Sequence, residues 1–154
     1  MIDHLNHVVN ALAPAANAFA GTVTTKVINM KNYGGACFVV QGGAGAVGTA
    51  TITVEACSDI TPSATTAIGF FYQECLATDV FGPIIQASAA GFTTTAAANK
   101  VYKIYVTDES LASTGYAYVR LKSVEVVVGA IAGGVVAVLT DARFEQEIPD
   151  TVVV

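Results

Sequence analysis

The sequence predicts an all-β protein, an antiparallel β-sandwich of jelly-roll-like or barrel-like form. Between Thr22 and Thr140, apolar and polar residues alternate with a period of two in several segments. Turn-forming stretches such as Asn32–Gly35 and Phe81–Pro83 separate these segments, and no long helical pattern alternates with them. Many short strands joined by polar turns are typical of a sandwich or barrel.

A chain of 154 residues is long enough for one domain with its own core. We divide it into an N-terminal arm (1–21), a β-sandwich domain (22–144) and a C-terminal tail (145–154). In the arm, His4, Leu5, Val8, Val9 and Leu12 are spaced to line one face of a short helical turn that Pro14 ends. We therefore expect the arm to lie outside the main body.

Strict alternation identifies the strands of the body. The segments that alternate most clearly lie around residues 22–27, 51–56, 102–106 and 117–122. Further candidates are 37–41, 67–75, 84–87, 91–95, 124–128 and 135–140. The residues expected in a core between two sheets are Ile52, Val54, Ile104, Val106, Val119 and Leu121. Those expected to face outward are Thr51, Thr53, Arg120 and Lys122.

One helical turn interrupts the series of strands after residue 107. Thr107 is a suitable N-cap, and the carboxylates of Asp108 and Glu109 favour the positive end of a helix. Gly115 is suited to ending it.

Charge and hydropathy exclude two classes of partner. The net charge is −5 and the pI is about 4.7, so nucleic acid is not expected as a ligand. The longest uncharged apolar run, Val126–Thr140, is shorter than the ~20 residues of a spanning helix and suits two strands and a turn. No membrane contact is expected. Residues 1–19 lack the basic start of a signal peptide, which predicts synthesis in the cytosol without export by that route.

Metal and cofactor sites are not expected. Cys37, Cys57 and Cys75 form no CxxC pair, which favours free thiols packed as small apolar groups. His4 and His7 lie three residues apart, but no second ligand pair is placed to close a site with them.

A glycine-rich stretch matches a dinucleotide-binding fingerprint by its letters alone. Gly43, Gly45 and Gly48 have the GxGxxG spacing, yet the residues after Gly48 alternate as a strand. A pyrophosphate site requires a helix at that point. The stretch is therefore interpreted as the flexible tip of a β-hairpin, without a cofactor.

Catalysis is also not expected. No serine lies in a GxSxG motif, and no histidine outside the arm is placed to act as its base. A carboxylate pair, drawn from Glu55, Glu74, Asp79, Asp108 and Glu109, stays open as a glycosidase site. The chain has no Trp, which disfavours sugar hydrolysis.

The exposed strand faces carry threonine in place of charge, which suits a surface committed to an assembly. Both ends of the chain are apolar and too short to fold alone. The residues expected in an interface between subunits or with a larger assembly are Leu5, Val8, Val9, Leu12, Val152, Val153 and Val154.

Three segments resemble small structural proteins of tailed-bacteriophage virions. They are residues 50–59 (ATITVEACSD), 91–96 (GFTTTA) and 115–122 (GYAYVRLK). Within that group the chain is most similar to capsid decoration, or cement, proteins. The resemblance implies a β-sandwich on the outer surface of an icosahedral capsid, assembled in the host cytoplasm, often as a homotrimer. Its partners would be the major capsid protein, whose adjacent subunits it clamps, and its own copies.

Two other functions remain open. A phage tail or receptor- or glycan-binding β-domain would keep the same fold, and exposed aromatic clusters at loop tips would favour it. A small enzyme built on a sandwich would need two of the carboxylates above in one cleft.

Overall fold

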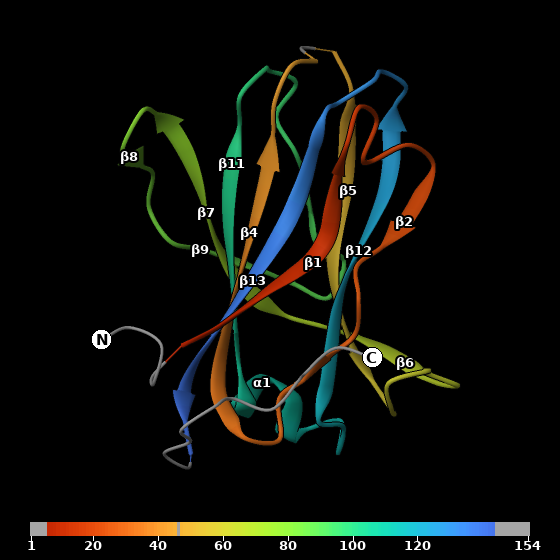
Figure 1. The fold of residues 1–154 in the computed structure, drawn as a ribbon, viewed down its shortest axis with the longest axis vertical. Coiled ribbons are helices and arrows are strands. Elements are labelled where there is room, and N and C mark those ends of the chain that lie inside the picture. The colour runs from red at the N-terminus through yellow and green to blue at the C-terminus, as the bar shows by residue number, and fades with distance from the viewer. Residues whose placement is uncertain (1–5, 46, 144–154) are drawn as a thin grey trace.

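Two antiparallel β-sheets face each other in the computed structural model, which describes residues 6–45 and 47–143 (Figure 1). The seven-stranded sheet has the order β1-β13-β4-β11-β7-β8, with β9 also paired to β7. The six-stranded sheet has the order β10-β5-β12-β2, with β3 paired to β12 and β6 to β5. The predicted all-β sandwich is confirmed.

Each sheet combines long central strands with short strands at its edges. The seven-stranded sheet contains β1 (His7–Ala15), β4 (Tyr33–Gly42), β7 (Phe70–Ala77), β8 (Val80–Phe81), β9 (Ile85–Ala87), β11 (Val101–Thr107) and β13 (Gly133–Ala142). The six-stranded sheet contains β2 (Thr22–Thr24), β3 (Ile28–Asn29), β5 (Thr49–Cys57), β6 (Thr65–Ile68), β10 (Phe92–Thr93) and β12 (Tyr118–Val127).

The core lies between the sheets, and alternation predicted it correctly. The six residues expected there are all buried, at 3% exposure or less: Ile52, Val54, Ile104, Val106, Val119 and Leu121. Their neighbours Thr51, Thr53, Arg120 and Lys122 lie on the opposite strand faces and are partly exposed. Aromatic rings fill one part of the core, where Tyr72 and Phe92 stack with their centroids 3.9 Å apart.

The predicted helical turn is α1 (Asp108–Ala112), which lies at one end of the sandwich (Figure 1). Thr107 is its N-cap, and the Thr107 hydroxyl accepts a hydrogen bond from the Ser110 backbone N–H at 3.3 Å. Leu111 is buried and fixes the helix against the core. The helix ends at Ala112 with Ser113 as its C-cap, and Gly115 follows at φ +71°, which glycine adopts without strain.

The N-terminal arm was predicted wrongly. Its residues His7–Ala15 form β1, a strand that pairs antiparallel with β13. Val9 and Ala11 point into the core and are buried. The pairing slips between Asn10 and Leu12, so a bulge breaks the alternation that would have marked a strand. The segment belongs to the body of the domain.

The glycine-rich stretch is followed by a strand, as predicted, but it is not the tip of a hairpin. It joins β4 to β5, which lie in different sheets. The Gly43 N–H donates to the Ala132 carbonyl at 2.6 Å, and the Asn99 N–H donates to the Gly43 carbonyl at 2.8 Å. These bonds hold the described part of the connection against two neighbouring loops.

Two predicted strand boundaries also differ from the structure. The single strand expected over 67–75 is divided at Gly69 into β6 and β7, which belong to different sheets. The two strands expected over 117–122 and 124–128 are one continuous strand, β12. The apolar run Val126–Thr140 does hold the end of one strand and most of another. Among the described residues, no helix is long and apolar enough to cross a membrane.

Candidate interaction surfaces

The outer face of the seven-stranded sheet carries a row of uncharged side chains across five strands. In register order these are Val8 on β1, Val138 on β13, Cys37 on β4, Tyr105 on β11 and Phe71 on β7. We call them the apolar row. Its two ends are open to solvent, with Val8 65% and Phe71 45% exposed. A wide and largely apolar face of this kind is suited to contact with another protein.

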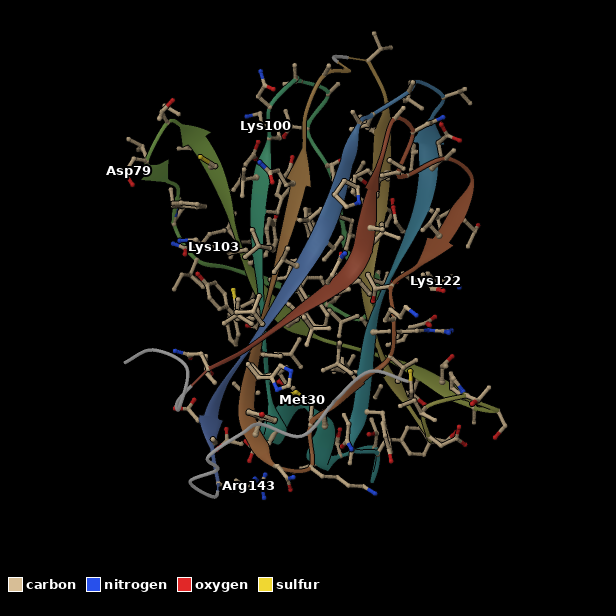
Figure 2. The ribbon with its side chains drawn as sticks, in the orientation of Figure 1. Met30, Asp79, Lys100, Lys103, Lys122 and Arg143 are labelled. Atoms are coloured by element: carbon tan, nitrogen blue, oxygen red, sulfur yellow. The ribbon has the colours of Figure 1, made fainter. Side chains whose placement is uncertain are left out.

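The next row across the same face is also largely uncharged. It consists of Asn10, Val136, Val39, Lys103 and Gln73. Its one cation, Lys103, lies over the Phe81 ring with Nζ 3.6 Å from the ring centroid. Figure 2 shows Lys103 on the side of the molecule where β7, β8 and β9 lie. The cation therefore sits toward one edge, and the charge-free area is centred on β13 and β4.

A groove of about 250 Å³ extends this face toward the loops after β4 and before β13. Gly43, Gly133 and Gly134 form part of its lining, together with Leu12 and Val136. Gly134 is held close to β1, because a Cβ there would come within 2.9 Å of the Leu12 carbonyl. The close approach of β1 to β13 thus shapes the groove.

The far edge of the same sheet holds a second group of exposed apolar residues. Leu76, Val80, Ile84 and Ile85 lie on β7, β8, β9 and the connections between them, each at least 43% exposed. In Figure 1 this edge projects from the body of the sandwich. Among the exposed large apolar residues of the described chain, Phe71 is the one aromatic. The exposed aromatic clusters that would favour a receptor binder are thus not found on the described loops.

The outer face of the six-stranded sheet is different, because it carries charge. Arg120 lies opposite Glu55 in the β12–β5 pairing, and Lys122, opposite Thr53, is the next β12 residue on the same face. Glu55 binds both cations, with Arg120 at 2.8 Å and Lys122 Nζ at 3.5 Å. At the other end, Lys31 Nζ lies 5.2 Å from the centroid of the Tyr118 ring. We call Lys31, Arg120 and Lys122 the cationic stripe.

The carboxylates considered for catalysis are not brought together in one cleft. Glu55 lies on the outer face of the six-stranded sheet, whereas Glu74 lies on β7 and pairs with Lys100 at 2.8 Å. Asp108 pairs with Arg143 at 2.7 Å. The hollow beside α1 contains one carboxylate, Asp108, and the groove on the seven-stranded sheet contains none. Glu55, Glu74 and Asp108 therefore lie in three separate places, each beside a cation.

The three cysteines are free thiols, as the sequence predicted. Cys57 is fully buried, and burial raises its pKa from the ordinary value of 9.0 to about 11. Burial also raises the pKa of Cys37, although the nearby Lys103 acts in the opposite direction. Both thiols are therefore protonated at neutral pH, and a protonated thiol is a poor nucleophile and metal ligand.

The histidine pair gives no metal site in the part of the chain that the structure describes. His7 Nδ1 lies 3.2 Å from the Tyr33 hydroxyl, and the two rings meet edge to face. His4 lies outside the described residues. Among those that are described, no group of three or more His, Cys, Asp or Glu side chains is placed to hold a metal ion.

The predicted interface residues have different positions. Val8 is exposed at the end of the apolar row, where a partner could contact it. Val9 is buried in the core and belongs to the fold. Leu12 is partly buried, packs against the core and also lines the groove on the seven-stranded sheet. Leu5, Val152, Val153 and Val154 lie outside the described residues.

Sequence reasoning missed the other members of the apolar row. Val138, Cys37, Tyr105 and Phe71 come from four strands, and only the register places them side by side. Comparisons with protein-family models, with curated proteins and with solved structures find no match to this chain.

Proposed function

We propose that the protein is a non-catalytic structural protein of a bacteriophage virion, which decorates and stabilises the icosahedral capsid. In this role it binds adjacent subunits of the major capsid protein and associates with its own copies, as a homotrimer. The proposal combines the sequence resemblance with one observation, the charge-free apolar row across five strands. A face of this kind provides contact area without the desolvation of charged groups.

The chemistry of the described residues also supports a binding role. Three of the carboxylates that could act as acid or base are paired with cations, and two of the three thiols have raised pKa values. The domain also has two large sheets and one short helix, an arrangement that presents broad rigid faces. These features favour assembly over catalysis.

Co-sedimentation with capsids that lack the protein tests the proposal. We expect the purified protein to pellet with such capsids at a fixed stoichiometry that is a multiple of three per binding position. Val8→Lys and Phe71→Lys place a charge at either end of the apolar row and should weaken pelleting. Thr24→Lys, on an exposed position of the other sheet, is the matched control and should bind as the unchanged protein does.

Each outcome decides between the functions considered. Failure of the unchanged protein to pellet would contradict the capsid role. Normal pelleting of both apolar-row variants would show that another surface makes the contact. If particles without the protein stayed robust but failed to adsorb to host cells, the tail or receptor-binding alternative would replace the capsid role.

A further inference from the structure

A hollow of about 360 Å³ lies beside α1, at one end of the sandwich. Met30 and Leu111 line it and are themselves buried, so they form its apolar floor. Ala112 and Tyr116 also contribute to the lining. Figure 2 places Met30 toward this end of the molecule. The hollow has the size and lining to accept one or two apolar side chains.

The rim of the hollow is cationic on balance. It carries Lys31, Arg143 and Asp108, and the Asp108 carboxylate binds Arg143 at 2.7 Å. Lys31 is exposed and is also the first member of the cationic stripe, which continues along β12 through Arg120 to Lys122. Lys122 lies four residue steps beyond Tyr118 along the strand, a distance of about 13 Å. Because Glu55 binds both Arg120 and Lys122, the positive charge that the hollow opens onto is mainly that of Lys31 at its rim.

The segment that follows Arg143 has the complementary chemistry. Residues 144–154 include Phe144 and Ile148, the carboxylates Glu145, Glu147 and Asp150, and no lysine or arginine. Eleven residues reach at most about 36 Å. Arg143, the last described residue before this segment, itself lines the hollow.

We propose that residues 144–154 bind this hollow, and Lys31 at its rim, within their own chain. Phe144 and Ile148 occupy the apolar floor, and Glu145 and Glu147 pair with Lys31. The same-chain arrangement is favoured because a segment tethered at the rim has a very high effective concentration there. This inference does not depend on the capsid role, since it concerns the isolated protein.

Zero-length carbodiimide cross-linking of the full chain tests the contact. An equal mixture of ¹⁴N- and ¹⁵N-labelled protein distinguishes contacts within a chain from contacts between chains. We expect an amide bond between Lys31 Nζ and Glu145 or Glu147, in cross-linked peptides that each carry a single isotope. Lys26, an exposed lysine outside the hollow, is the internal control and should give little cross-link to the same carboxylates.

Peptides of mixed isotope would show exchange between copies and would overturn the same-chain assignment. Cross-links of Lys26 and Lys31 to the segment in equal yield would show that it has no preferred site. Either result leaves the capsid proposal untouched, because no capsid is present.

A charge-swap series gives a second, independent readout. Lys31→Glu should increase amide hydrogen exchange severalfold over residues 111–117, and adding Glu147→Lys should restore protection. Phe144→Ser should increase exchange over the same residues without altering charge. Lys26→Glu is the matched control and should leave exchange unchanged. If neither Lys31→Glu nor Phe144→Ser changes exchange at 111–117 in the folded protein, the proposal is wrong.

Discussion

Arg120 and Glu55 lie directly opposite each other on β12 and β5, and the guanidinium binds a carboxylate that is almost completely buried. Arg120 Nε and Nη2 are both 2.8 Å from Glu55 Oε2. Lys122 Nζ lies 3.5 Å from the other oxygen, Oε1. The pair joins the two central strands of the six-stranded sheet on the side away from the core.

Removing the arginine should destabilise the protein because the buried carboxylate then loses its main partner. We expect Arg120→Met to lower the free energy of unfolding by about 1.5–3 kcal/mol, with Lys122 offsetting part of the loss. The double variant Arg120→Met/Glu55→Gln should recover part of this. Urea denaturation at pH 7 measures both. The exposed Lys26→Met is the control, and an equal effect there would contradict the role of the pair.

Because Leu121 lies in the sandwich core, Leu121→Ala should strongly lower the free energy of unfolding. Leu121 is 3% exposed on β12, so its truncation leaves a cavity between the sheets. We expect a loss of about 2–5 kcal/mol in the free energy of unfolding. Thr24→Ala, on the exposed neighbouring strand, should change it by less than about 0.5 kcal/mol. If the two variants changed the free energy of unfolding equally, Leu121 would not be packed in the core.

Two glycines with positive φ should respond differently to alanine. A Cβ at Gly45 would lie 2.1 Å from the Ala130 carbonyl oxygen, whereas a Cβ at Gly21 would have nothing within 4 Å. Gly21→Ala should therefore cost about 1–2 kcal/mol from the left-handed backbone alone. Gly45→Ala should cost clearly more, because the connection between the sheets must move. Equal thermal midpoints for the two variants would contradict this packing.

Stability should fall at alkaline pH, in part because of Cys57. A thiol whose pKa is raised on folding, here from 9.0 to about 11, contributes stability that is fully present below pH 9. That contribution is lost as the pH rises toward 11. The raised pKa values of Lys100, Tyr102 and Tyr105 act in the same direction.

Urea titrations between pH 8 and pH 11 measure this decline. Cys57→Ala should make it shallower, whereas the curves should run parallel below pH 9. An unchanged slope in Cys57→Ala would mean that the thiol does not contribute.

The proposed capsid role predicts that particles without the protein release DNA at a lower temperature than complete particles. A protein that binds only the assembled capsid stabilises it by about 2.7 kcal/mol per site when present at a hundred times its Kd. Adding the protein back should restore the release temperature. Particles that are equally heat-stable with and without it would contradict a stabilising role.

The central strands were predictable from the sequence because one face of each strand is buried in the core. Ile52 and Val54, or Ile104 and Val106, alternate with partly exposed neighbours, and burial enforces this period. β1 was missed because its buried residues include the small Ala11, and its bulge shifts the pattern into helical spacing. Local pattern therefore identifies a strand only where the pairing is regular.

The candidate interaction surface was much harder to predict from the sequence. Val8 and Val138 are adjacent in the sheet although β1 and β13 come from opposite ends of the described chain. No local pattern encodes which strands are neighbours, so the apolar row emerges only with the register. The same holds for Glu55 and Arg120. Alternation predicted that Arg120 faces outward, but it could not predict that Arg120 lies opposite Glu55.

The antiparallel pairing of β1 with β13 also sets the order in which the chain can fold. His7 pairs with Leu139, so β1 waits for about 130 further residues to be synthesised before its partner exists. At ribosomal rates of 5–20 residues per second, that wait lasts roughly 7–26 s. During this time the apolar residues of β1 have no sheet to join. Such distant pairing predicts slow folding and a nascent chain that is prone to associate with its neighbours until β13 arrives.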